Sequence, residues 1–242
     1  MVSVIKEFDN ELIVKGDVVK SGNLTSGINF GNIELKNVYF SYQNKLIIKN
    51  LNLAITQNKI TSIIGKSGSG KSTLVKLILG LLPCSQGEIL IDGKKLSDFD
   101  HSYLHDNVSM VSQDVKLFND SVYSNISYGN SKITDYHIDQ VIAKLNLRNT
   151  VFRNLTYGLK TQVGVQGSNL SNGQRQITLI LRSYLQNKKI FILDEPTTAL
   201  DPNTKQVVLE LIKQVSKNRT TIIVTHDLEV KKISDKIFEI NK

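Results

Sequence analysis

A glycine-rich loop follows a β-branched run and opens an apolar stretch, an order that predicts strand, loop and helix. The loop comprises Gly65, Lys66, Ser67, Gly68, Ser69, Gly70, Lys71, Ser72 and Thr73. Glycines let the backbone N–H groups of a tight loop converge on a phosphate, and the helix N-terminus adds its partial positive charge. Lys71 is then placed to reach the terminal phosphates, and the Ser72 hydroxyl to ligate Mg²⁺. The pattern predicts a binding site for a nucleoside triphosphate.

Two adjacent carboxylates, Asp194 and Glu195, end an apolar run at residues 190–193. In open parallel sheets, ligands bind beyond the carboxyl ends of the strands. Asp194 is therefore predicted to hold Mg²⁺ through water, and Glu195 to act as general base for the attacking water. His226 follows another buried run at residues 220–225. We expect its imidazole at the same sheet edge, where it hydrogen-bonds the γ-phosphate and orients the water or Glu195.

The elements that must position these groups follow from hydrophobic periodicity. Strands are expected at residues 33–40, 47–55, 60–64, 87–93, 189–193, 220–225 and 237–240. Helices are expected from the glycine loop to Pro83 and at residues 135–145, 170–185 and 204–217, and residues 96–165 give a mixed signal. Because uninterrupted apolar strands alternate with helices, the pattern indicates a parallel sheet covered on both faces.

Composition narrows the class of protein. The 242 residues, 40% of them hydrophobic, suit one large domain or one and a half small ones, with a sizeable core. The longest apolar run, residues 77–83, is far shorter than the ~20 residues of a membrane span, so we expect this chain alone to be soluble. The net charge of +8 comes from scattered lysines, which favours a solvated surface over a nucleic-acid groove or proximity to an anionic cytoplasmic leaflet. Cys84 is the single cysteine, which excludes an internal disulfide.

Five features, in this order along the chain, resemble the ATP-binding-cassette (ABC) ATPase domains over about residues 32–242. They are the glycine loop, Leu170-Ser171-Asn172-Gly173-Gln174, Asp194-Glu195, Ala199-Leu200-Asp201 and His226. The second feature is the most specific, because it is similar to the Leu-Ser-Gly-Gly-Gln signature of that family. The resemblance implies an α/β fold of the P-loop NTPase class, with a mainly parallel sheet flanked by helices. It also implies an N-terminal antiparallel β subdomain and a helical signature subdomain at about residues 114–185.

The resemblance implies that the signature segment, residues 170–174, contacts the nucleotide bound to a second subunit. Ser171, Gly173 and Gln174 would bind the γ-phosphate held by a second ABC ATPase domain, so that two domains sandwich two ATP molecules. Ser171 is suited to cap a helix whose N–H groups form an anion site. Asp201 would lie in the loop that crosses the dimer interface. Asn172 replaces the usual first glycine, and asparagine is the least costly alternative if that position needs a positive φ.

Two further residues carry roles only through the resemblance. Tyr42 matches the aromatic that stacks on adenine, with Tyr39 as its rival. Gln113 matches the glutamine that senses Mg²⁺ and the attacking water and couples to the transport domain. Residues 117–126 resemble the exporter segment that faces the coupling helices. Residues 1–31, with a short helix expected near residues 4–12, resemble the linker that follows an exporter's membrane region.

The function implied by the resemblance is ATP hydrolysis that drives export through a transmembrane domain, at the cytoplasmic face of a membrane. One alternative is a non-transport ABC ATPase acting on nucleic acid or ribosomes, whose members usually carry coiled-coil insertions or tandem cassettes. Another is a regulatory nucleotide-binding module with weak turnover, and a third is a small-molecule P-loop kinase. The segment at residues 170–174 speaks against the kinase.

Overall fold

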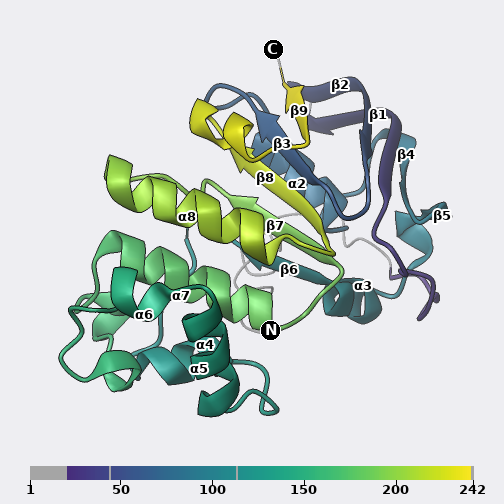
Figure 1. Cartoon of the computed structure of the whole chain (residues 1–242). Helices are drawn as coiled ribbons and strands as arrows, with labels where there is room; N and C mark the ends of the chain where they lie inside the picture. The colour runs from purple at the N-terminus through teal and green to yellow at the C-terminus, as the bar shows by residue number, and fades with distance from the viewer. Residues whose placement is uncertain (1–20, 44, 113, 241–242) are drawn as a thin grey trace.

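A computed structural model describes residues 21–43, 45–112 and 114–240. Two sheets form its framework (Figure 1). The antiparallel sheet has the order β2-β1-β4-β5 and consists of β1 (Ile33–Tyr42), β2 (Lys45–Ile55), β4 (Gln86–Ile91) and β5 (Lys94–Lys95). The parallel sheet has the order β6-β7-β8-β3-β9 and consists of β3 (Ile60–Ile64), β6 (Val108–Val111), β7 (Ile190–Asp194), β8 (Thr220–Thr225) and β9 (Lys236–Glu239). The predicted α/β class, with a parallel sheet and an antiparallel β subdomain, is confirmed.

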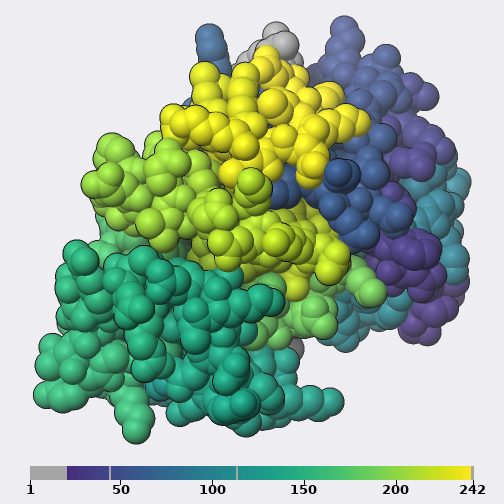
Figure 2. Space-filling view, viewed as in Figure 1, coloured from purple at the N-terminus to yellow at the C-terminus, as the bar shows by residue number. Residues whose placement is uncertain are grey.

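The helices fall into two groups. Those beside the sheets are α2 (Lys71–Ile78), α3 (His101–Asn107) and α8 (Pro202–Val215), and α7 (Asn172–Leu185) runs from the parallel sheet into the second group. That group contains α4 (Val122–Ser127), α5 (Asp135–Lys144) and α6 (Leu147–Thr150). In Figure 2 the teal and green segment that holds α4–α6 forms a lobe at the end opposite the purple antiparallel sheet. Four 3₁₀ turns connect elements among the described residues: Leu96–Asp98, Gly158–Lys160, Val165–Gly167 and Leu228–Lys232.

The parallel strands separate two hydrophobic cores. Along β7, Phe191 and Leu193 pack into the core with α7 and α8, whereas Ile190 and Ile192 pack into the core with α2 and the antiparallel sheet. Successive strand residues point to opposite faces, so a strand covered on both faces must be apolar throughout. All four of these side chains are 0% exposed. This double burial explains the unbroken apolar run that the sequence shows before Asp194.

The helix after the glycine loop is shorter than predicted. It ends at Ile78, not near Pro83, because Gly80 adopts a left-handed φ of 69°. The Leu81 N–H donates to the Lys76 carbonyl at 2.9 Å, which closes the helix in the manner of a Schellman motif. The mixed stretch resolves into α3, β6 and α4, of seven, four and six residues. Elements this short present too few turns or alternations for periodicity to reveal them.

Residues 21–32 lie against the domain. Ile28 is 4% exposed, and the Leu24 N–H donates to the Asp98 carbonyl at 2.8 Å. Asp92, in the turn after β4, accepts backbone N–H bonds from Asn29, Phe30, Gly31 and Asn32 at 2.8, 2.9, 3.0 and 2.9 Å. Burial would raise the pKa of Asp92, but these backbone hydrogen bonds outweigh it and lower the pKa. The helix expected near residues 4–12 lies outside the described residues, and the division at residue 31 stays a prediction.

We predict that Asp92→Asn lowers the free energy of unfolding by roughly 1–3 kcal/mol at pH 7, because an amide group replaces a charged acceptor that faces N–H donors. Urea denaturation measures it, with the exposed Asp98→Asn as control. Since the folded pKa of Asp92 lies below its unfolded value, its stabilisation is present above pH ~4 and is lost as the pH falls through the folded pKa. The difference between the two proteins should therefore shrink below pH ~4. A constant difference down to pH 3 would contradict this role.

Candidate functional site

Three neighbouring strands deliver the predicted groups to one edge of the parallel sheet. Ile64 at the end of β3 pairs with Thr225 of β8, and Asp194 at the end of β7 pairs with Val224 of β8. An open cavity of about 680 Å³ lies at this edge. Its lining consists of Ile47, Lys66, Ser67, Gly68, Gly70, Lys71, Ser72, Thr73, Asp194, Glu195, Thr198 and His226. The glycine loop, the two carboxylates and the imidazole thus meet at one cavity.

The loop has the backbone that phosphate binding needs. Gly68 and Gly70 have φ angles of 74° and 101°, a region that residues with a Cβ rarely enter. A Cβ on Gly70 would also lie 3.2 Å from the Ile47 side chain. Gly70 is the N-cap of α2, whose first N–H groups lack intrahelical partners. The buried Ser69 hydroxyl has no hydrogen-bond partner among the residues that the structure describes.

The Lys71 ammonium donates to the carbonyls of Gly65 and Lys66 at 2.7 and 3.1 Å. Both carbonyls belong to the loop itself, so the cation lies within the bend that a polyphosphate would occupy. Ser72 and Asp194 line the same cavity and offer a hydroxyl and a carboxylate, the oxygen ligands that Mg²⁺ prefers. The residues present therefore fit both a nucleoside triphosphate and Mg²⁺.

Glu195 is held by three side chains. Its Oε1 lies 2.9 Å from His226 Nδ1, and its Oε2 accepts from the hydroxyls of Thr225 at 2.8 Å and Thr198 at 3.2 Å. Its backbone is left-handed, with a φ of 50°, and its N–H donates to the Val224 carbonyl at 2.8 Å. A left-handed non-glycine residue persists only where its surroundings fix it. The β7 and β8 strand ends therefore orient the Glu195 carboxylate.

Burial raises the pKa of Asp194 to about 6, the neighbouring Glu195 charge adds to the rise, and Lys71 opposes it. The site thus holds a carboxylate that its own surroundings disfavour in the ionised form. Positive charge from a divalent cation would relieve this cost.

We predict that Asp194→Asn stabilises the nucleotide-free, metal-free chain by roughly 1–2 kcal/mol at pH 7.5, a value discounted for the partial exposure of the carboxyl. The folded pKa of about 6 lies above the ordinary aspartate pKa of 3.8, so the ionised form destabilises the fold fully above pH ~6 and not at all below pH ~4. Urea denaturation at several pH values should show the gain at pH 7.5 and its disappearance by pH 4. An Asp194→Asn chain less stable than the original at pH 7.5 would contradict the assigned cause.

The signature segment forms a capped helix start away from this cavity. Ser171 is the N-cap of α7, and it forms a capping box with Gln174, whose side chain accepts from the Ser171 N–H at 3.0 Å. A Cβ on Gly173 would lie 2.2 Å from Thr204, so α7 packs closely on the start of α8. Asp201 caps α8 by accepting from the Asn203 and Thr204 N–H groups, both at 3.1 Å. None of these residues lines the cavity of the glycine loop in the same chain.

Asn172 does not need the positive φ considered for it from the sequence. It is the first helical residue of α7 and is not among the left-handed residues of the described chain. Tyr42 ends β1, is 42% exposed and stacks edge-on against Phe40 with ring centroids 4.8 Å apart. Its hairpin carries Ile47, which lines the cavity, although Tyr42 itself does not. Gln113 lies outside the described residues.

Sequence reasoning missed the two threonines that hold Glu195. Thr225 ends a strand in which all six residues are buried, and a hydroxyl there needs a partner. If β7 and β8 are taken as neighbours, the requirement of the buried Thr225 hydroxyl for a partner indicates the Glu195 carboxylate. Thr198 lies on the irregular segment between β7 and α8, where no period indicates the direction of a side chain.

A parallel sheet with a strand–glycine loop–helix unit, an acidic strand end and a Mg²⁺-competent cavity defines a P-loop nucleoside triphosphatase. A protein-family model described as "ABC transporter" matches residues 48–198. The chain therefore belongs to the ABC transporter family.

The relatives include the "ATP-dependent lipid A-core flippase" of Haemophilus influenzae (strain 86-028NP), 36% identical over 87% of this chain and 36% of that protein. The "Alpha-hemolysin translocation ATP-binding protein HlyB" of Escherichia coli is 39% identical over 94% of this chain and 33% of that protein. A solved "bacterial Atm1-family ABC exporter with ATP bound" has a TM-score of 0.81 and 29% identity, covering 99% of this chain and 42% of the exporter chain. This chain spans about a third of the length of these curated relatives.

Within residues 21–240 as described, none of the helices combines the length and the apolar character needed to cross a membrane.

Proposed function

We propose that this chain is the nucleotide-binding domain of an ABC exporter, where it hydrolyses ATP to drive transport through a transmembrane domain. The observation that carries the proposal is the meeting of the glycine loop, Asp194, Glu195 and His226 at one cavity. Exporters among the relatives support the transport role. The domain would work at the cytoplasmic face of a membrane, held there by its transmembrane partner.

The side chains divide the reaction among them. Lys71 and the first N–H groups of α2 neutralise the β- and γ-phosphates, and Ser72 and Asp194 would hold Mg²⁺. When bound, Mg²⁺ would supply further neutralisation of the phosphate charge. Glu195 accepts a proton from the attacking water. Because His226 Nδ1 lies 2.9 Å from Glu195, we assign His226 first to orienting that carboxylate, and its other ring nitrogen stays available to the γ-phosphate.

The signature segment serves a second copy of the domain in this proposal. Ser171 and the N–H groups of Asn172 and Gly173 form a capped helix start with no nucleotide site of its own chain beside it. A second ABC ATPase domain, identical or different, would place its γ-phosphate there and complete an ATP sandwich. Gln174 and Asp201 would then lie at the dimer interface, and Tyr42 would stack on adenine. Gln113 would sense Mg²⁺ and the attacking water.

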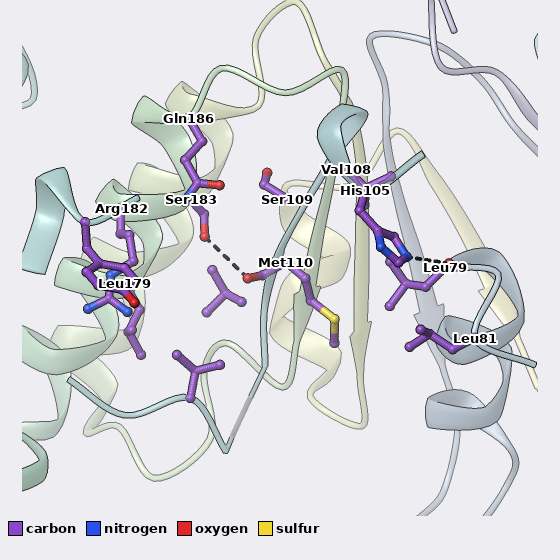
Figure 3. Close-up of a pocket in the computed structure, with 13 residues that line it drawn as sticks. Leu79, Leu81, His105, Val108, Ser109, Met110, Leu179, Arg182, Ser183 and Gln186 are labelled. Atoms are coloured by element: carbon purple, nitrogen blue, oxygen red, sulfur yellow. Dashed lines mark hydrogen bonds between the residues drawn. The ribbon is translucent and has the colours of Figure 1, made fainter. Parts of the chain in front are cut away.

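The transmembrane partner has a candidate docking groove along β6, the edge strand of the parallel sheet (Figure 3). Leu79 and Leu81 line one side of this groove and α7 lines the other, where the Ser183 hydroxyl donates to the Met110 carbonyl at 3.4 Å. Apolar side chains dominate the lining. Arg182, buried against Asn125 with bonds of 2.7 Å, joins α7 to the exporter-like segment at residues 117–126. We expect a helical segment of the transmembrane domain to occupy this groove.

We predict that Leu81→Glu reduces co-purification of the chain with the co-expressed membrane-spanning part of the exporter by about tenfold or more, because it buries a charge in an apolar contact. ATP hydrolysis by the isolated chain should change less than about twofold. Leu228→Glu, at a leucine that is exposed outside the groove, is the control and should leave both unchanged. Equal co-purification of Leu81→Glu and the unmodified chain would contradict docking of the transmembrane domain in this groove.

Two measurements on the purified chain test the function. One is ATP turnover with and without Mg²⁺, and the other is whether the chain is a monomer or a dimer with each nucleotide bound. We expect Mg²⁺-dependent release of phosphate and ATP-driven dimerisation. Salt-dependent binding of nucleic acid that stimulates turnover would favour the non-transport ABC ATPase instead. ATP binding with negligible turnover would favour the regulatory module.

A further inference from the structure

Asp227 follows the imidazole of the site directly and connects three segments of the chain. Its Oδ2 accepts from Lys205 Nζ and from the Thr197 hydroxyl, both at 2.8 Å. Its Oδ1 accepts from the Glu229 N–H at 3.0 Å. Lys205 lies in α8, and Thr197 lies on the segment that follows Glu195. One carboxylate therefore holds together α8, the segment after β7 and the turn after β8.

This cluster is largely shielded from solvent. The side chains of Asp227 and Lys205 are 15% and 25% exposed, and Thr197 is 2% exposed. Burial alone would raise the pKa of Asp227, but the hydrogen bonds from Lys205, Glu229 and Thr197 outweigh it and lower the pKa. Asp227 is therefore ionised at neutral pH, and its hydrogen bonds have the added strength of charge-assisted ones.

The backbone of Asp227 is linked to the proposed general base through one hydroxyl. The Asp227 N–H donates to the Thr225 hydroxyl at 3.0 Å, and that hydroxyl lies 2.8 Å from Glu195 Oε2. Because a carboxylate only accepts and an amide N–H only donates, the single Thr225 hydroxyl proton points to Glu195. The contacts of Asp227 therefore extend through Thr225 to the carboxylate that would accept the proton from water.

Asp227 also restrains the chain on the other side of the general base. Thr197, which donates to it, lies two positions after Glu195. Glu195 has a left-handed φ of 50°, a conformation that persists only where its surroundings hold it. His226 lies between the end of β8 and Asp227, so its backbone is held on both sides. The one carboxylate therefore restrains both members of the Glu195–His226 pair.

We propose that Asp227, paired with Lys205, is a positioning residue for ATP hydrolysis that holds Glu195 and His226 in their working geometry. This inference rests on the proposed function and deepens it. Asp227 does not line the cavity of the glycine loop, so it acts through the groups that it holds. Lys205 supplies the positive charge that a partly buried carboxylate requires.

The test measures kcat and nucleotide affinity for the unmodified chain and Asp227→Asn. An asparagine at position 227 must turn its NH₂ group toward Lys205, Thr197 or the Glu229 N–H, all of which donate. We expect kcat to fall about tenfold, as for the loss of one hydrogen bond to a charged group. ADP affinity, measured by calorimetry, should stay within about twofold, because the residues that line the cavity are unchanged.

Asp235→Asn is the matched control. Asp235 also accepts from a lysine, Lys59 at 3.1 Å, and from a backbone N–H, that of Ile60 at 2.8 Å. Ile60 begins β3, whereas the glycine loop follows the other end of that strand. Asp235→Asn should therefore leave kcat within about twofold, although it removes the same kind of contact from the fold.

Two further comparisons separate positioning from damage to the fold, and the first of them does not need the Asp227→Asn chain to fold. Lys205→Met should lower kcat about as much as Asp227→Asn, whereas Lys205→Arg, which keeps the charge, should keep kcat within about threefold. Thr225→Val removes the hydroxyl that links Asp227 to Glu195. Adding Asp227→Asn to Thr225→Val should therefore lower kcat further by less than about threefold.

Four results would overturn the inference: an unchanged kcat in Asp227→Asn, an equal loss in Asp235→Asn, no difference between Lys205→Arg and Lys205→Met, or losses that multiply fully in the double variant. In each of these cases the proposed function would stand, because the unmodified chain would still hydrolyse ATP. Absence of Mg²⁺-dependent turnover in the unmodified chain would overturn the proposed function, and this inference with it.

Discussion

Replacing Glu195 by glutamine should leave ATP binding intact and slow hydrolysis about 10²-fold or more. Glutamine keeps the shape of the side chain and one oxygen for Thr225 or His226, but it cannot accept a proton from water at neutral pH. The left-handed backbone at Glu195 and its bond to the Val224 carbonyl do not depend on the charge. The loss should therefore fall on kcat, with the affinity for ATP unchanged.

Single-turnover hydrolysis and calorimetric ATP binding measure the two effects separately. Glu210→Gln makes the same substitution at an exposed position of α8 and serves as the control, with rates expected within about twofold of the original. A Glu195→Gln chain that hydrolyses ATP at the original rate removes Glu195 from the role of general base. The next carboxylate to consider would then be Asp194, at the end of the same strand.

Lys71→Ala should abolish measurable nucleotide binding. Lys71 is 8% exposed, and its ammonium donates to the carbonyls of Gly65 and Lys66, inside the bend of the glycine loop. Its removal takes away a buried positive charge from the place where several phosphate charges must gather. A charge-assisted contact of this kind is about twice as strong as a neutral one, and the buried surroundings add to its effect. We expect the Kd for ATP to rise about 10²-fold or more.

Calorimetric titration with ATP and Mg²⁺ measures this change. Lys49→Ala, on the exposed face of β2, removes the same charge outside the cavity and should leave the Kd within about twofold. Unchanged ATP affinity in Lys71→Ala would contradict the phosphate-loop assignment itself. The thermal unfolding midpoint of both variants must match that of the original chain, because otherwise unfolding could account for the loss of ATP binding.

The sequence predicted the buried framework well, because burial leaves a strong pattern there. β7 and β8 are apolar throughout since both of their faces are covered, and Asp194 interrupts that pattern where the strand reaches solvent. The order of the parallel strands places Asp194 and the glycine loop on either side of β8, as the rule for carboxyl ends of parallel strands anticipates.

Contacts that depend on tertiary structure left no such pattern. Periodicity did not reveal that Thr198 and Thr225 hold Glu195, because their hydroxyls matter only once two strand ends are adjacent. The hydrogen bond from the Asn172 side chain to the Ala199 carbonyl joins residues 27 positions apart, one at a helix start and the other on an irregular segment. The helix stop at Gly80 was missed because Pro83 is the stronger helix breaker in the sequence, whereas the left-handed glycine acts first.

The most direct measurement is a crystal structure of this chain with Mg²⁺ and a non-hydrolysable ATP analogue. Lys71 Nζ is expected to leave the carbonyls of Gly65 and Lys66 and to contact the β- and γ-phosphates, with Asp194 facing the metal and Glu195 facing the terminal phosphoryl group. A nucleotide seated elsewhere, with Lys71 still bonded to the loop carbonyls, would contradict phosphate binding at this loop.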